Sequence, residues 1–149
     1  MGIFERLRVL KSFFPRFTDV RCILSDMIAL YAEDDLDDFD MFSDIVKVLN
    51  PSYKTVNVRN GQEVLDFLEN AEAKPSIIFL DINMPIVDGR ACLKFIKKDP
   101  RFENIPIVIY STSNNKQDIE LCYQLGATAY VEKPFTFKEG VDRLSKFFR

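Results

Sequence analysis

The chain has 149 residues, which is enough for one domain with a substantial hydrophobic core. Hydrophobic residues account for 47% and charged residues for 29% of it, as in an ordinary globular protein, and a net charge of −3 gives no reason to expect nucleic acid as a partner. There is no histidine, which excludes Ser-His-Asp hydrolases, Cys-His proteases and H-E-x-x-H zinc enzymes, and also a role as a phosphohistidine carrier.

The three cysteines, Cys22, Cys92 and Cys122, are far apart and form no C-x-x-C pair. This spacing predicts reduced thiols in a cytoplasmic protein, and it argues against a disulfide framework or a zinc site. No apolar run is long enough for a membrane span or a signal-peptide core, so we do not expect a membrane as a partner.

Residues 1–26 differ in charge from the rest of the chain, with five basic and three acidic side chains. Apolar residues recur there at helical spacing from Ile3 to Phe17, although Pro15 interrupts the pattern. One interpretation is a basic amphipathic helix that lies on a membrane surface or a partner. The other is a disordered arm or a simple extension ahead of a domain of residues 27–149. Because the pattern is short and interrupted, we favour the second.

From residue 27 onwards, predicted strands alternate with predicted helices. Short runs of apolar and β-branched residues predict strands at 27–32, 53–58, 77–80, 105–110 and 128–131. Apolar residues at helical spacing predict helices at 39–49, 64–68, around 92–96, 116–125 and 137–148, and Gly126 suits a left-handed cap. Strict alternation predicts an α/β fold with helices on both faces of a parallel sheet. We expect a doubly wound, five-stranded (βα)5 sheet of the flavodoxin-like type, with strand order 2-1-3-4-5.

Polar residues follow four of these strands directly. Glu33 and Asp34 come after the first, Asp81 after the third, Ser111 after the fourth and Lys133 after the fifth. All of them should therefore lie at one edge of the sheet, where ligands bind in such folds. Neighbouring strands are roughly 5 Å apart, so three carboxylates there would repel one another unless a cation neutralises them. Mg²⁺ is the hard cation that prefers such oxygen ligands.

Four segments resemble the receiver domains of two-component response regulators, and they occur in the order of that family. They are IALYAEDD at 28–35, FLDINMPIVDG at 79–89, IVIYST at 107–112 and GATAYVEKPF at 126–135. The resemblance covers the chain from about residue 27 to its end. Residues 97–106 look most like the small stand-alone receivers that partner phytochrome-type and other sensor kinases.

The resemblance implies that Asp81 accepts a phosphoryl group from a sensor histidine kinase or a histidine phosphotransfer protein and becomes an aspartyl phosphate. It implies Mg²⁺ as the cofactor, bound directly by Asp34 and Asp81, through water by Glu33, and by the main-chain carbonyl of Asn83.

Four further residues receive a role from the resemblance. Lys133 supplies a fixed positive charge to a phosphoryl oxygen, and Ser111 donates a hydroxyl hydrogen bond to the attached group. Tyr130 turns inward when Ser111 moves, which changes the surface that a partner contacts. The peptide bond before Pro134 is expected to be cis, which would aim Lys133 at the site.

Other interpretations stay open beside this one. The leading hypothesis is a signalling switch that catalyses its own phosphorylation and dephosphorylation, without turnover of a small substrate. Since the chain ends after the fifth helix, we expect its output to be a downstream protein partner or onward phosphotransfer, and a second copy of the chain, in a homodimer, is a further candidate partner. The alternative is a pseudo-receiver that binds proteins without being phosphorylated. A dehalogenase-type phosphatase is disfavoured, because Asn83 stands where that family has a second aspartate. We assign Asp35, Asp37 and Asp38 only to the acidic first turn of a helix.

Overall fold

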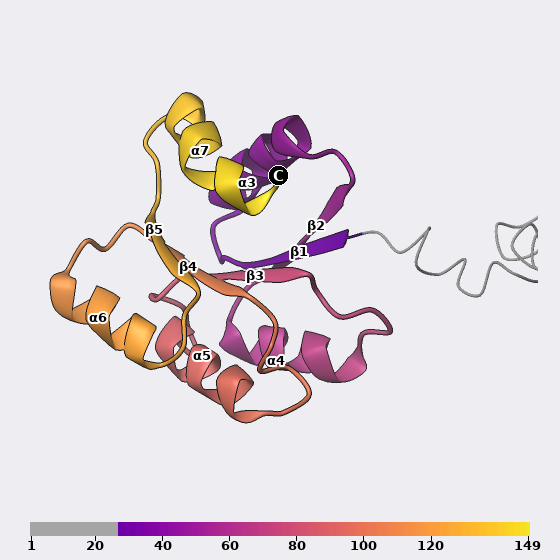
Figure 1. Ribbon diagram of the computed structural model, residues 1–149, viewed down its shortest axis with the longest axis vertical. Coiled ribbons are helices and arrows are strands. Elements are labelled where there is room, and N and C mark those ends of the chain that lie inside the picture. Colours follow the sequence, from indigo (N-terminus) through magenta and orange to yellow (C-terminus); the bar gives the residue numbers. More distant parts are fainter. Residues whose placement is uncertain (1–26) are drawn as a thin grey trace, which may run out of the picture.

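The computed structural model describes residues 27–149, which form a parallel sheet between two layers of helices (Figure 1). The two interpretations of residues 1–26 therefore lie outside the described residues. Within residues 27–149, none of the helices has the length and apolar character needed to cross a membrane.

Five parallel strands form the sheet. They are β1 (Met27–Ala32), β2 (Tyr53–Val58), β3 (Ile77–Leu80), β4 (Ile107–Ser111) and β5 (Ala129–Glu132). Their order is β2-β1-β3-β4-β5, which confirms the predicted topology. In this register Ala32 pairs with Leu80, and Ser111 pairs with Glu132. The residues that follow these pairs, including Glu33, Asp81 and Lys133, therefore leave the sheet at the same edge.

Each α-helix begins where a polar side chain can cap it. The helices are α3 (Leu36–Leu49), α4 (Gly61–Asn70), α5 (Gly89–Lys98), α6 (Lys116–Gln124), α7 (Phe137–Leu144) and the 3₁₀ turn η1 (Ser145–Phe147). The capping residues are Asp35, Asn60, Asp88, Asn115 and Thr136, and each side chain accepts a hydrogen bond from a backbone N–H of the first turn. Gly126 has a φ of +103°, which agrees with the predicted left-handed cap after α6.

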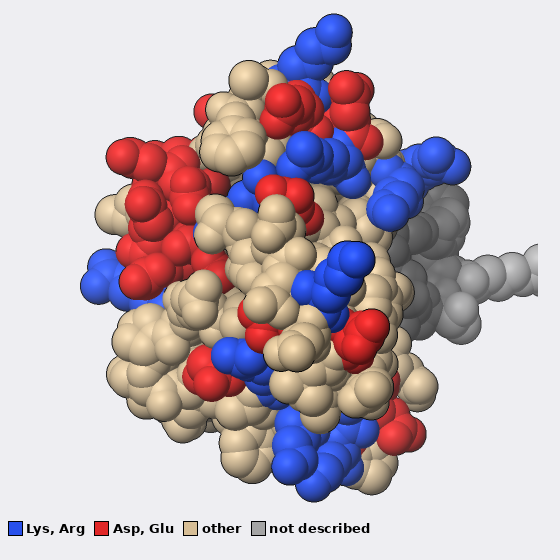
Figure 2. Space-filling view, turned by 90° about the vertical axis from the view of Figure 1, so that its left-hand side faces the viewer, with Lys and Arg blue, Asp and Glu red and all other residues tan. Residues whose placement is uncertain are grey.

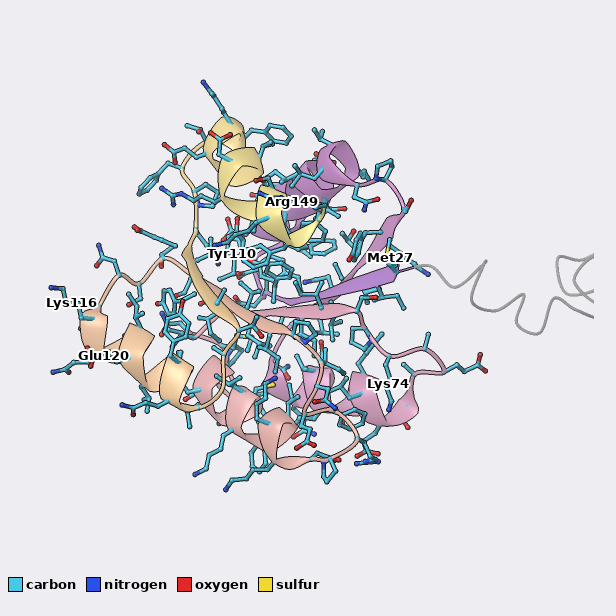
Figure 3. The ribbon with its side chains drawn as sticks, viewed as in Figure 1. Met27, Lys74, Tyr110, Lys116, Glu120 and Arg149 are labelled. Atoms are coloured by element: carbon cyan, nitrogen blue, oxygen red, sulfur yellow. The ribbon has the colours of Figure 1, made fainter. Side chains whose placement is uncertain are left out.

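The helices divide into two layers with separate cores. Helices α3 and α7 cover one face of the sheet, and α4, α5 and α6 cover the other (Figure 1). The core under α3 and α7 is rich in aromatic rings, and Tyr110 lies within it between the sheet and these helices (Figure 3). The rings of Phe42 and Tyr31 are 4.6 Å apart, and those of Phe42 and Phe79 are 4.9 Å apart. This packing fixes α3 against β1 and β3, the two strands that end at the acidic residues.

Candidate functional site

Four of the residues predicted for the site are buried at the carboxyl edge of the sheet. Glu33, Asp81, Ser111 and Lys133 are each exposed by no more than 9%, and they are four of the five polar or charged residues that are buried in the described part of the chain. Because burying charged groups without partners is costly, their contacts with one another show how the site is built.

The ammonium group of Lys133 is the centre of the site. Its Nζ donates to Oδ2 of Asp81 at 2.7 Å, to Oε2 of Glu33, and to Oδ2 of Asp38 at 3.2 Å. Burial alone would lower the pKa of Lys133, but the hydrogen bonds to Asp81 and Glu33 outweigh it and hold the pKa above its ordinary value. Lys133 is therefore a fixed positive charge beside the Asp81 carboxylate.

The carboxylate of Glu33 is held from two further sides. The buried hydroxyl of Tyr31 donates to its Oε2 at 3.1 Å, and the backbone N–H of Asp35 donates to its Oε1 at 3.0 Å. Burial and the adjacent Glu33 raise the pKa of Tyr31, so the phenol keeps its proton and remains a donor. Glu33 is thus fixed in position even though it lies at the end of a strand.

The carboxylate of Asp81 is oriented by two donors. Its Oδ2 receives the Lys133 hydrogen bond, and its Oδ1 accepts from the backbone N–H of Asn83 at 3.1 Å. The loop that follows is closed by Gly89, whose N–H donates to the carbonyl of Ile82 at 3.1 Å. The Asp81 carboxylate is therefore held in a fixed direction, beside the Lys133 ammonium at the carboxyl edge of the sheet.

The grouping of acidic side chains differs from the expectation of three adjacent carboxylates. Within residues 27–149, no three acidic or thiol side chains lie close enough together to hold a metal ion. The physical reason is that the Lys133 ammonium occupies the position between Glu33 and Asp81, while the side chain of Asp34 is exposed. The residues present nevertheless offer only oxygen ligands, which are the kind that hard divalent cations prefer.

The expectation of a cis peptide bond before Pro134 is wrong. No peptide bond among residues 27–149 is cis. Lys133 reaches the site because β5 positions it, with its backbone N–H donating to the carbonyl of Ser111 at 2.8 Å. The guanidinium of Arg143 also donates to the carbonyl of Glu132 at 2.8 Å and holds this segment against α7.

A chain of hydrogen bonds connects Ser111 to Tyr130. The Oγ of Ser111 accepts from the backbone N–H of Ser113 at 3.2 Å, and the hydroxyl of Tyr130 donates to the carbonyl of Ser113 at 2.8 Å. The ring of Tyr130 is half-buried and packs on the core under α4, α5 and α6. The two residues predicted to act as a switch are therefore linked through the backbone N–H and carbonyl of Ser113.

Comparison with known proteins gives the family. The model of the response regulator receiver domain matches residues 30–145, which is most of the chain. The chain belongs to this family. Its sequence is 29% identical over 117 residues to response regulator Rcp1 of Synechocystis, covering 75% of this chain and 80% of Rcp1. It is also 29% identical over 118 residues to the polar-differentiation response regulator DivK of Brucella anthropi, covering 79% and 93% of the two chains.

Solved structures of receivers confirm the fold. The Mn²⁺-bound form of Rcp1 has a TM-score of 0.74 and 27% identity, and covers 83% of this chain and 95% of its own. The phosphorylated cyanobacterial phytochrome response regulator RcpA has a TM-score of 0.75 and 28% identity, and covers 81% and 90% of the two chains. The predicted resemblance to phytochrome-partner receivers is therefore confirmed at the level of family and fold.

One residue of this receiver site was missed from the sequence. We assigned Asp38 only to the acidic first turn of a helix, but its carboxylate contacts Lys133. Its position gives a usable signal, because it lies in the first turn of the helix that begins immediately after Glu33 and Asp34. A side chain in the first turn of α3 stays close to the site, because this helix begins directly beside it.

Large apolar side chains are exposed in the segments that lead away from the site. They are Leu36, at 57% exposure, Ile86, at 80%, Phe135, at 88%, and Phe137, at 44%. These residues follow β1, β3 and β5, the strands that end immediately before Glu33, Asp81 and Lys133. Figure 2 shows one side of the molecule, where acidic side chains gather in one area and basic side chains at the lower end. The exposed apolar side chains and the buried charges of the site thus lie in the same segments of the chain, those that follow β1, β3 and β5.

Proposed function

We propose that this receiver is a phosphorylatable switch, in which Asp81 accepts a phosphoryl group from the phosphohistidine of a sensor histidine kinase or a histidine phosphotransfer protein. The observation that supports this most directly is the Asp81 carboxylate itself, which is nearly buried yet lies 2.7 Å from the Lys133 ammonium at the carboxyl edge of the sheet. Because a buried ion pair often contributes less to stability than apolar residues of similar volume would, its presence at the ligand-binding end of the sheet favours a functional role.

The transfer that these residues support is an in-line displacement at phosphorus. A carboxylate oxygen of Asp81 forms the new P–O bond, the P–N bond to the donor imidazole breaks, and the released imidazole nitrogen takes up a proton. Charge is then spread over the three equatorial phosphoryl oxygens. Lys133 is already beside Asp81 and neutralises part of that charge without a large rearrangement.

A divalent cation is the cofactor that the site's oxygen ligands favour, and we propose Mg²⁺. Asp34 and Asp81 would bind it directly, Glu33 through water, and Asn83 through its main-chain carbonyl. When bound, such an ion neutralises phosphoryl charge and fixes its orientation. The structure of Rcp1 with Mn²⁺ and that of phosphorylated RcpA support both parts of the proposal by analogy.

The attached phosphoryl group would change the surface through Ser111 and Tyr130. Ser111 would donate to a phosphoryl oxygen and would thereby alter its hydrogen bond with the backbone of Ser113. The same residue's carbonyl accepts from the Tyr130 hydroxyl, so the change would reach Tyr130. A downstream protein partner, or a further histidine in a phosphorelay, would contact the altered surface. The exposed Phe135 and Phe137 are suited to protein contacts, and the buried, unpaired Cys92 and Cys122 suit a reducing cytoplasm.

The test is the intact mass of the protein after incubation with Mg²⁺ and acetyl phosphate, beside an Asp81→Asn variant. We expect one phosphoryl adduct that requires Mg²⁺ and is absent from the variant. No adduct with either acetyl phosphate or a purified kinase would contradict the proposal. It would instead favour a pseudo-receiver that acts as a protein-binding module.

A further inference from the structure

All three N–H donors of the Lys133 ammonium meet carboxylate oxygens of the protein itself. An ammonium has three donors and no acceptor, and here they reach Glu33, Asp81 and Asp38. A phosphoryl group on Asp81 needs a donor from the same ammonium, so one of these three contacts must be given up. If the Asp81 contact were the one exchanged, binding of a phosphoryl group would not depend on Asp38. This requirement rests on the proposed function, since it arises only if Asp81 is phosphorylated.

We propose that Asp38 is a positioning residue of the receiver site, whose carboxylate holds Lys133 in the unphosphorylated protein and competes with the phosphoryl group for it. Asp38 thereby restrains phosphorylation, and its contact with Lys133 is the one that is exchanged when the phosphoryl group arrives.

The contact with Glu33 is unsuited to this exchange. The Glu33 side chain is only 3% exposed, and its two oxygens are also held by the Tyr31 hydroxyl and the Asp35 backbone N–H. Breaking its contact with Lys133 would leave a buried carboxylate without its counter-charge, which is strongly unfavourable. Glu33 therefore stays with Lys133 in both states.

The contact with Asp38 has the opposite character. Its distance of 3.2 Å is longer than the 2.7 Å to Asp81, and the Asp38 side chain is 47% exposed. When the ammonium moves away, water can solvate this carboxylate at once. Asp38 also lies in the first turn of α3, where the helix dipole favours a negative charge. Releasing Asp38 therefore costs less than releasing Glu33.

The helix keeps Asp38 facing Lys133 until that exchange takes place. The backbone N–H of Asp38 donates to the capping side chain of Asp35 at 3.3 Å, and Phe42 and Ile45 bury the same helix against the sheet. A small pocket of about 20 Å³, open to solvent and large enough for about one water molecule, lies beside this contact. It is lined by Tyr31, Asp38, Met41, Tyr110, Lys133 and Pro134. A water molecule there can take over the solvation of the group that Lys133 leaves.

The test compares Asp38→Asn with Asp37→Asn, which removes the same charge from the adjacent exposed position. The probe is beryllofluoride, a phosphoryl analogue, titrated calorimetrically into the full chain with saturating Mg²⁺. We expect Asp38→Asn to bind the probe about two- to fivefold more tightly, the range for loss of a partly exposed ion pair, and to be phosphorylated faster by acetyl phosphate. Asp37→Asn should match the wild type, and Asp38→Glu, which restores the carboxylate, should return towards it.

Three results would overturn the inference. One is unchanged or weaker binding of beryllofluoride by Asp38→Asn, provided that the thermal unfolding of this variant matches that of the wild type. If it does not match, Asp38→Ser replaces it in the same comparison. Another is an equal effect of Asp37→Asn, which would assign the change to overall charge. The last is a loss of Mg²⁺ affinity in Asp38→Asn measured without beryllofluoride, which would make Asp38 a metal residue. A wild-type protein that forms no adduct at Asp81 would instead refute the proposed function, and the inference with it.

Discussion

The most direct link between the fold and the proposed chemistry is the contact between Gly89 and Asp81. Gly89 is the first residue of α5, and a methyl group added there would lie 2.2 Å from the backbone carbonyl oxygen of Asp81 and 2.9 Å from its carbonyl carbon. An ordinary contact needs at least 3.4 Å, so Gly89→Ala requires a displacement of about 1.2 Å. Since the obstacle is backbone, no side chain can move aside.

Two effects of Gly89→Ala are expected, and both are large. Forcing a methyl group into packed backbone costs about 1–3 kcal/mol of unfolding free energy, of which the better helix propensity of alanine returns less than about 1 kcal/mol. A shift of about 1 Å at a reacting group can reduce a rate about 100-fold. We therefore expect Gly89→Ala to lose about 1–2 kcal/mol of stability and to be phosphorylated by acetyl phosphate at least about tenfold more slowly.

The control is Gly126→Ala, at the end of α6 and away from the site. Its φ of +103° makes alanine unfavourable by about 1–2 kcal/mol, so the loss of stability is similar. The assays are urea unfolding and the rate of the intact-mass shift, with all proteins well folded at the assay temperature. If Gly89→Ala were phosphorylated as fast as Gly126→Ala, the position of Gly89 against Asp81 would have no bearing on the chemistry.

Three further predictions concern single side chains. Tyr31→Phe removes the buried donor to Glu33 and should lower the unfolding free energy in urea by about 1.5 kcal/mol; no change would show that the hydrogen bond contributes nothing. Ile86 has a φ of +66° and is 80% exposed, so Ile86→Asn should raise stability by about 1 kcal/mol, and a decrease would contradict the assignment of strain. Burial, assisted by Asp88, raises the pKa of the Cys92 thiol to about 12, so the folded state keeps a proton that the unfolded chain releases near pH 9. This stability is present at about pH 8 and is lost as the pH rises, by about 2 kcal/mol at about pH 10.5. Cys92→Ala should show a correspondingly smaller loss over that range, and an equal loss would argue against a perturbed thiol.

The topology could be predicted because each segment carries its own signal. The run from Ile77 to Leu80 is apolar without interruption, which suits a strand covered on both faces, and β4 is likewise buried along its length, with only Ser111 at its end being strongly polar. Helix bounds were less accurate, because the caps and the last turns depend on tertiary contacts. The last helix was predicted to run to residue 148, but it ends at Leu144 and continues as a 3₁₀ turn that places Phe148 in the core.

The sequence predicts those site residues whose positions are determined by the ends of the strands. Glu33, Asp81, Ser111 and Lys133 meet because parallel strands share one carboxyl edge. The first-turn position of Asp38 places it near Glu33 and Asp34, but it does not by itself predict the contact with Lys133, since an aspartate in the first turn of a helix is favoured by the dipole alone. The direction in which its side chain points depends on how α3 packs on the sheet.

The hydrogen-bond chain through Ser113 has a consequence for signalling noise. If Ser111 and Tyr130 must both leave their present partners to produce output, two hydrogen bonds of about 1 kcal/mol each separate the resting arrangement from the signalling one. A gap of about 2 kcal/mol leaves about 3% of the molecules in the minor arrangement without any phosphate. The receiver would then have a low but nonzero signalling output without phosphorylation. The level of that output would be set by the backbone of Ser113, which takes no part in the chemistry.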